Sequence, residues 1–221
     1  MTLCGEGCVR YHDVRAQIRT GDLLLFRGSH PLSRLIRRAT HSPYSHAGLL
    51  TWWAPREAAA IQRLMVLEAT HPFITLRPAS EVVGAYLGTV DWFPLQEQYR
   101  PKLRTEVLLQ EALERLGNEY SVAGLFDNLW ARLGLLALAA RSRGRKRFCS
   151  EYVSECMRMA LQDPVVEVSD HFTSPQALSQ SPLWRAAGRL QLPRVEHAQR
   201  RDETRQAQLA RLHARGQFTS E

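Results

Sequence analysis

The stretch RFCSEYVSEC, residues 147–156, predicts a helix with a cysteine in its first turn. Four residues recur at the i, i+4, i+7 and i+11 spacing of one buried helical face: Cys149, Val153, Cys156 and Ala160. Charged residues such as Glu151 and Glu155 fall on other faces of the same helix. We therefore expect Cys149 to face the core, at its rim.

Two features of this stretch favour the thiolate form of Cys149. A helix N-terminus carries a partial positive charge, and the basic residues Arg145, Lys146 and Arg147 come directly before the cysteine. The alternative is that Cys149 is a small apolar residue that fills the core, as free cysteines usually do. This stretch alone does not choose between a nucleophile and a core residue.

The composition is that of a globular protein with a substantial core. The chain has 221 residues, of which 44% are hydrophobic and 23% charged, which suits one ordinary domain. From residue 194 onward the sequence is charged and poor in large apolar residues. We therefore expect a single domain over residues 1–193, followed by a solvent-exposed helix or tail over residues 194–221.

No segment of the sequence predicts export or membrane insertion. The N-terminus lacks the apolar run of a signal peptide. The most apolar segment, residues 122–140, is interrupted by Asp127, Asn128 and Arg132, which would be costly at bilayer depth. We expect a protein that is cytoplasmic as synthesised, so that action on the periplasm or envelope would need a non-classical route such as a dedicated secretion machine or phage lysis.

The excess of basic residues raises the question of an anionic partner. The formal net charge is +7 and the isoelectric point is near 9.7. The basic residues are scattered, however, with no recognition helix, aromatic stacking platform or zinc-ligand spacing beside them, so we expect no nucleic-acid binding. A solvated surface, or attraction to an anionic membrane or cell-wall polymer, fits the charge at least as well.

The four cysteines do not form a recognisable disulfide or metal pattern. Cys4, Cys8, Cys149 and Cys156 are too few and too unevenly spaced for a disulfide framework in a chain of this length, so reduced thiols are expected. Cys4 and Cys8 lack a second pair of ligands at a zinc-like distance. We therefore predict neither a metal site nor a cofactor.

The remaining sequence predicts a mixture of strands and helices. Apolar runs and alternation indicate strands near residues 23–26, 44–53, 64–70, 74–77 and 88–95. Helical spacing indicates helices that open at Pro31, at Pro78, near Val107 and at Val122, and a short helix capped by Thr173 and Ser174 before Pro175. This pattern predicts an α+β domain.

His46 is the histidine best placed to meet the thiol. It begins the strand over residues 44–53, and alternation places His46, Gly48 and Leu50 on one face. Because Gly48 has no side chain, another group can approach the imidazole there. The alternative is a strand-end histidine that bonds a backbone carbonyl. His41 and His71 are rivals, but neither belongs to a regular element.

Glu68 is a carboxylate in the middle of the apolar strand over residues 64–70. A buried ionised acid is costly unless it is paired or hydrogen-bonded, so Glu68 needs a partner. An imidazole N–H would supply one, and the carboxylate would then hold the ring in one tautomer and orientation. The alternative is an acid on an exposed edge that faces water.

Several short motifs together resemble a known family. Gly21 and Asp22 precede an apolar strand, the tetrapeptide SHAG covers residues 45–48, Glu68 lies in a later strand, FCSEYV covers residues 148–153, and Ser174 and Pro175 follow. In this order they resemble the permuted NlpC-type papain-like cysteine hydrolases, in particular the YiiX-like branch, which are related to the lecithin retinol acyltransferase-like proteins. In ordinary papain-like enzymes the cysteine helix comes before the histidine strand, whereas here it comes last.

The resemblance implies a circularly permuted papain-like fold, with a small curved or barrel-like antiparallel sheet of about five strands and the nucleophile helix packed against it. It also implies that Cys149 is the nucleophile, His46 the base and Glu68 the orienting group. The backbone N–H of Cys149 is a natural oxyanion donor. Tyr44, close to His46 in sequence, is our candidate for lining the substrate pocket, with simple packing as the alternative.

The expected activity is a cysteine hydrolase that cleaves amide bonds, including cell-wall peptides, through a Cys-His-Glu triad and an acyl-thioester. The alternative is a lipid-directed cysteine hydrolase or acyltransferase, which the apolar segment 122–140 and the basic surface favour. A second alternative is a non-catalytic binding module on the same scaffold. The presence of Cys149, His46 and Glu68 together argues against that last reading.

Overall fold

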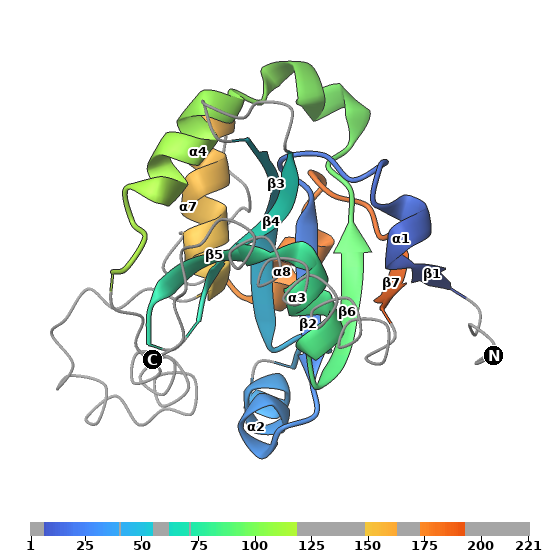
Figure 1. Ribbon diagram of the computed structural model, residues 1–221. Helices are drawn as coiled ribbons and strands as arrows, with labels where there is room; N and C mark the ends of the chain where they lie inside the picture. The colour runs from blue at the N-terminus through green and yellow to red at the C-terminus, as the bar shows by residue number, and fades with distance from the viewer. Residues whose placement is uncertain are drawn as a thin grey trace, which may run out of the picture.

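A seven-stranded sheet forms the centre of the protein in the computed structural model (Figure 1), which describes residues 7–39, 41–54, 62–70, 72–118, 149–162 and 173–192. The strand order is β1-β7-β6-β2-β3-β4-β5. The strands are β1 (Cys8–Arg10), β2 (Leu23–Gly28), β3 (His46–Trp53), β4 (Arg63–Ala69), β5 (Ile74–Pro78), β6 (Gly88–Phe93) and β7 (Gly188–Gln191). Neighbouring strands pair antiparallel, except that β1 and β7 pair parallel.

Helices cover both faces of this sheet. The helices in the described segments are α1 (Tyr11–Val14), α2 (Pro31–Ala39), α3 (Ala79–Ala85), the 3-10 helix η2 (Glu97–Lys102), α4 (Thr105–Leu113), α7 (Cys149–Leu161) and α8 (Pro175–Gln180). Residues of α4, α7 and α8 share one hydrophobic core with one face of the sheet, and residues of α1 and α3 share a second core with the other face. None of the helices in the described segments combines the length and the apolar character that a bilayer crossing requires.

The central strand β2 explains why the apolar run LLLF has no polar alternation. Leu23 and Leu25 point into the core with α7, while Leu24 and Phe26 point into the core with α1 and α3. All four side chains are fully buried. A strand covered on both faces needs apolar residues at every position, so a continuous apolar run is expected there.

The sheet is larger and more open than expected. The predicted strands correspond to β2 to β6, but β7 and β1 extend the sheet beyond β6, giving seven strands instead of about five. Of the two expected shapes, curved or barrel-like, the barrel-like one is wrong, because the order is linear, with β1 and β5 at its two edges. The two added strands are short, and β7 buries only Leu190, so they carry no strong apolar pattern. The predicted helix from Val122 and the tail over residues 194–221 lie outside the described residues.

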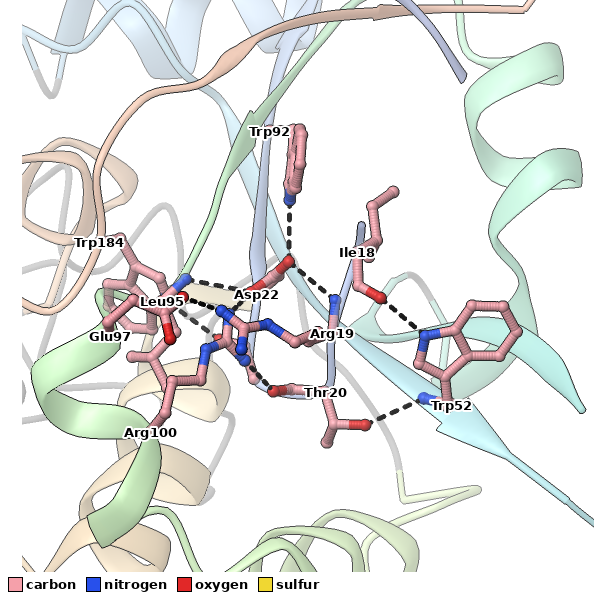
Figure 2. A network of polar contacts seen from close by, with 11 residues as sticks. Ile18, Arg19, Thr20, Asp22, Trp52, Trp92, Leu95, Glu97, Arg100 and Trp184 are labelled. Atoms are coloured by element: carbon pink, nitrogen blue, oxygen red, sulfur yellow. Dashed lines mark hydrogen bonds and ion pairs between the residues drawn. The ribbon is translucent and has the colours of Figure 1, made fainter. Parts of the chain in front are cut away.

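Asp22 joins the start of β2 to the segment that follows β6 (Figure 2). The fully buried carboxylate accepts four hydrogen bonds. Its Oδ2 atom accepts the Arg19 backbone N–H at 3.0 Å and the Trp92 indole N–H at 3.0 Å. Its Oδ1 atom accepts the Leu95 backbone N–H at 3.1 Å and the Arg100 guanidinium. A buried carboxylate with this many donors is satisfied, and Asp22 therefore acts as a structural anchor.

Hydrogen bonds that involve the backbone before Asp22 hold the adjoining end of β3. Gly21 has φ +89, which favours glycine, and its N–H donates to the Leu50 carbonyl at 2.9 Å. The Trp52 indole N–H donates to the Ile18 carbonyl at 2.7 Å, and the Trp184 indole N–H donates to the Gly21 carbonyl at 2.9 Å (Figure 2). These bonds fix β2 against β3 at the end opposite His46, so the register of the two strands is held from outside the candidate site.

Candidate active site

Strand register brings His46 and Glu68 together. His46 is the first residue of β3, and the β3–β4 register pairs Gly48 with Glu68. His46 and Gly48 share a face by alternation, so Glu68 lies diagonally across from His46. The Nε2 atom of His46 is 2.8 Å from Oε2 of Glu68. A Cβ at Gly48 would lie 2.8 Å from Cγ1 of Val66 and 3.3 Å from Cβ of Glu68, so glycine leaves the room in which Glu68 packs.

Glu68 is buried and doubly paired. Only 1% of the residue is exposed, so the alternative of an acid on a solvent-facing edge is wrong. Its Oε1 atom accepts two hydrogen bonds from Arg77 of β5, from Nε at 3.0 Å and from Nη2 at 2.6 Å. Burial raises the pKa of the carboxyl, but bonding and charge attraction from His46 and Arg77 outweigh it and hold the pKa below its usual value. Glu68 is therefore the ionised partner of both groups.

Sequence reasoning did not identify Arg77 as part of the site. The contact depends on strand register, because the β4–β5 pairing sets Glu68 opposite Thr75 and places Arg77 two residues further on the same face. The side chain of Arg77 is 41% exposed, so it extends from the solvent-exposed surface to the buried carboxylate of Glu68 and places a positive charge beside it. Arg77 thereby offsets part of the cost of burying Glu68 as an anion.

Cys149 is the first residue of α7 and is 5% exposed. It shares a hydrophobic core with Ala47 of β3, which places the thiol beside the strand that carries His46. Burial raises the pKa of the thiol, but the charge and hydrogen bonding of His46, together with the backbone N–H groups of Ala47 and Ser150, lower it below the ordinary thiol value. The helix start therefore holds a thiol that favours the thiolate.

The pKa of His46 is raised, in agreement with the lowered pKa of Cys149. Burial alone would lower it, but Cys149 and Glu68 stabilise the imidazolium more strongly. Because Nε2 bonds Glu68, the other ring nitrogen, Nδ1, remains for Cys149. The Phe26 ring lies 5.0 Å from the His46 ring, centroid to centroid, and limits its rotation. The arrangement can hold a thiolate–imidazolium pair oriented by a carboxylate.

The cysteine face of α7 is buried as its spacing predicts, but other faces of the helix are buried too, since Glu151 is only 5% exposed. Val153, Cys156 and Ala160 are fully buried. Ser150 Oγ donates to the Thr173 carbonyl at 2.7 Å, which ties the start of the helix to the segment before α8. Burial raises the pKa of Cys156 to about 12, so this second cysteine on the same face is an unreactive core thiol.

Tyr44 packs beside the site. Its ring meets Phe93 edge-on at 5.9 Å between centroids, and its hydroxyl donates to Oδ2 of Asp91 at 3.1 Å. The guanidinium of Arg27 lies 5.5 Å from the Tyr44 ring centroid. These contacts account for its burial through packing, and a role in substrate binding stays a prediction.

The two alternative histidines, His41 and His71, have no described contact with Cys149 or Glu68. His41 lies in an exposed turn with φ 48, and its backbone N–H donates to the Arg38 carbonyl. His71 lies outside the described residues. His46 is thus the histidine that the fold places between a cysteine and a carboxylate.

No protein-family model and no curated protein sequence matches this chain. Among solved structures, the chain is similar to the crystal structure of the metalloprotein yiiX from Escherichia coli O157:H7, DUF1105. The TM-score is 0.51 and the sequence identity 22%, over 77% of this chain and 96% of the other. At this identity the likeness shows a shared fold. The protein therefore has a YiiX-like α+β fold, with a mostly antiparallel, open sheet and helices on both faces.

The residues of the candidate site, Cys149, His46 and Glu68, do not fit a metal ion. Across the described segments, no group of three or more histidine, cysteine and acidic side chains is arranged to hold one. Glu68 already accepts from His46 at one oxygen and from the Arg77 guanidinium at the other. A carboxylate engaged by two cationic donors is a poor further ligand for a cation.

Proposed function

We propose that this protein is a cysteine hydrolase of the permuted NlpC-type papain-like kind, and that it cleaves amide bonds, including peptide and cell-wall peptide bonds. The observation that carries the proposal is the meeting of Cys149, His46 and Glu68 from α7, β3 and β4. A thiol at a helix start, a histidine and an orienting carboxylate are the parts that thiol-based acyl transfer requires. In the chain, the strands that carry His46 and Glu68 precede the cysteine helix α7, and this order supports the permuted topology.

The first half of the reaction acylates the cysteine. The Cys149 thiolate attacks the carbonyl carbon, an S–C bond forms, and the oxygen becomes an oxyanion that accepts the backbone N–H of Cys149. When the tetrahedral species collapses, the C–N bond breaks and the imidazolium of His46 gives its Nδ1 proton to the departing amine. The products of this half are a free amine, a neutral His46 and an acyl-thioester on Cys149.

The second half releases the acyl group. Neutral His46 takes a proton from water, and the oxygen of that water bonds to the thioester carbon. Collapse breaks the C–S bond, so that the thiolate leaves, the carboxylic acid departs, and the thiolate–imidazolium pair is restored. Throughout, Glu68 fixes the imidazole through its bond to Nε2 and stabilises the positive charge, without itself taking up a proton.

A lipid-directed hydrolase or acyltransferase is the second candidate, and one surface feature favours it. Helix α2 lies beyond the end of the sheet (Figure 1). It presents the apolar Leu35, which is 46% exposed, between the exposed basic residues Arg34 and Arg38. An apolar side chain flanked by cations suits the interface of an anionic membrane. The same Cys149 chemistry would then act on an acyl ester or N-acyl lipid.

Incubation with purified peptidoglycan and, separately, with phospholipid vesicles tests the proposal. Amine release from peptidoglycan supports the amide hydrolase, and fatty-acid release from vesicles supports the lipid enzyme. Cys149→Ser should abolish either activity, whereas Cys8→Ser, which removes a thiol outside the site, should retain it. Intact-mass detection of an acyl group on Cys149 would identify the intermediate. A folded protein with no turnover of either substrate and no adduct would contradict both enzymes and favour a binding module on the same scaffold.

A further inference from the structure

A tyrosine that sequence reasoning did not identify lies against the candidate site. Tyr86 follows α3, and its ring meets Phe26 edge-on at 4.9 Å between centroids. Phe26 in turn packs against His46 at 5.0 Å. The three rings form a continuous row of ring contacts from the imidazole of His46 through Phe26 to Tyr86. Tyr86 is thereby held at a fixed distance from the reacting groups.

The hydroxyl of Tyr86 lies in a space that Gly28 leaves open. A Cβ at Gly28 would come within 2.9 Å of that hydroxyl and would collide with the side chain of Ser33 on α2. The Gly28 backbone N–H donates to Ser45 Oγ at 3.2 Å, so the residue before His46 belongs to the same cluster. Burial, aided by the charges of Cys149 and Glu68, raises the pKa of Tyr86, and a hydrogen bond with Ser45 and the charge of Arg37 oppose that shift. The hydroxyl is therefore neutral and within electrostatic range of both the thiol and an arginine.

Arg37 lies on the same face of α2 as Ser33. The two residues are four positions apart, which is about one helical turn, and Ser33 is the residue that contacts the Gly28 and Tyr86 cluster. Arg37 therefore faces Tyr86, whereas the neighbouring Arg38 is exposed on another side. The Nε atom of Arg37 is buried without a hydrogen-bond partner in the described part of the chain. A buried Nε–H group without an acceptor can donate to an anion, and the charge of the guanidinium favours one.

We propose that Arg37 and the hydroxyl of Tyr86 form an anion-recognition subsite beside Cys149, which selects substrates that carry a carboxylate or phosphate near the scissile acyl group. The inference rests on the proposed function, because it takes Cys149 as the reacting atom. Arg37 supplies the charge and the N–H donors, and Tyr86 supplies a neutral O–H donor at a position fixed by the contacts of its ring with Phe26. Guanidinium groups bind both carboxylates and phosphates through paired N–H donors, so the geometry defines the charge of the selected group and leaves its source to experiment.

Alkylation of Cys149 with two reagents of different charge tests the subsite without a known substrate. In both reactions the thiolate displaces iodide, so the new S–C bond and the leaving group are the same, but iodoacetate carries a carboxylate and iodoacetamide does not. The ratio of the iodoacetate rate to the iodoacetamide rate, divided by the same ratio for N-acetylcysteine, should exceed one in the wild-type protein. Arg37→Gln should lower it about threefold to tenfold, the size expected for one partly screened charge a few ångströms away.

The matched control is Arg38→Gln, which removes the same charge from the exposed side of the same helix and should change the ratio less than about twofold. Tyr86→Phe retains the ring contact with Phe26 and removes only the hydroxyl. It should also lower the ratio, because the O–H donor of the subsite is lost. Equal ratios in wild type and Arg37→Gln, or equal losses in Arg37→Gln and Arg38→Gln, would overturn the proposal. If iodoacetamide itself does not label Cys149 ahead of Cys156, the proposed function fails instead.

A second measurement covers the case in which Arg37→Gln disturbs α2. In the wild-type protein, added succinate or inorganic phosphate should slow the labelling of Cys149 by neutral iodoacetamide, and sodium chloride at the same ionic strength should slow it less. Protection by succinate alone indicates a carboxylate substrate, and protection by phosphate alone indicates a phosphate substrate. If neither succinate nor phosphate slows the labelling more than sodium chloride does at the same ionic strength, the subsite is contradicted.

Discussion

The Nε2 atom of His46 lies 2.8 Å from the Oε2 atom of Glu68, although the two residues are 22 positions apart in the chain. The β3–β4 register creates this contact, and the bonds from Arg77 hold the carboxylate from the far side. Three adjacent strands thus contribute to one chain of charges that ends at Cys149. We expect this chain of charges to set the reactivity of the thiol.

Iodoacetamide at neutral pH should label Cys149 well before Cys156. Cys149 has a lowered pKa, whereas Cys156 is fully buried and its pKa is raised to about 12. Alkylation requires the thiolate, so the two cysteines differ in the reactive fraction as well as in access. Peptide mapping after timed quenching measures both rates in one sample. Equal labelling, or preferential labelling of Cys156, would remove Cys149 as the nucleophile.

The alkylation rate of Cys149 should stay high as pH falls below the ordinary thiol pKa of about 8.5. The thiolate is present above the lowered pKa of Cys149, and the imidazolium is present below the raised pKa of His46, which is about 10. Alkylation should therefore remain on its plateau at high pH, whereas turnover, which needs the His46 proton, should fall above about 10. His46→Ala should move the alkylation midpoint upward, and an unmoved midpoint would contradict the ion pair.

Glu68→Gln should lower turnover about tenfold or more while the protein remains folded. The amide cannot stabilise the imidazolium as the carboxylate does, and it can present the wrong group to Nε2. His46→Ala should be worse, and the double variant should be no worse than His46→Ala alone, because residues that act as one unit are non-additive. Rates for the three variants, with circular dichroism as the folding control, decide the matter. Normal activity in Glu68→Gln would leave at most a Cys149–His46 dyad.

Arg77→Gln should weaken the pH dependence of stability at acid pH. The pKa of Glu68 is lowered in the folded state, so its contribution is present above the unfolded carboxyl pKa and is lost as pH falls through the folded value. Removing Arg77 raises the folded pKa and should cost about 1 kcal/mol at pH 7, a value discounted because the arginine is partly exposed. Urea unfolding at pH 7 and pH 4 measures it. Arg63→Gln, on an exposed residue of β4, is the control, and the same loss in both variants would contradict the pairing.

Asp22→Asn should destabilise the fold by about 3 kcal/mol, because a buried carboxylate that is removed leaves its cationic partner and N–H donors unpaired. The amide cannot accept at both ends, so donors from Trp92, Leu95 or Arg100 lose a partner. Thermal and urea unfolding measure the loss. Glu97→Gln, which removes an exposed ion pair with Arg19, should leave the midpoint unchanged. A similar small effect for Asp22→Asn would show that the network does not anchor β2.

Local patterns were sufficient for much of the fold. The continuous apolar run of β2 predicts a strand that is buried on both faces, and the helical spacing of α7 predicts a buried face with Cys149 at its start. Both patterns can be recognised in the sequence alone. The cost of burying Glu68 could also be recognised, since a carboxylate within an apolar strand needs a cationic or donor partner. Even the room beside Gly48 followed from the absence of a side chain.

Contacts between elements were decided by the tertiary structure. Arg77 reaches Glu68, Arg37 faces Tyr86 and Asp22 collects four donors because several strand registers and helix positions are fixed at once, and none of these pairs shares a local pattern. The strands β1 and β7, at one end of the sheet, likewise form because β7 pairs with both β1 and β6, since the residues of these two strands bury little apolar surface. Periodicity determines the face on which a side chain lies, whereas the partner that it meets there depends on the packing of the whole chain.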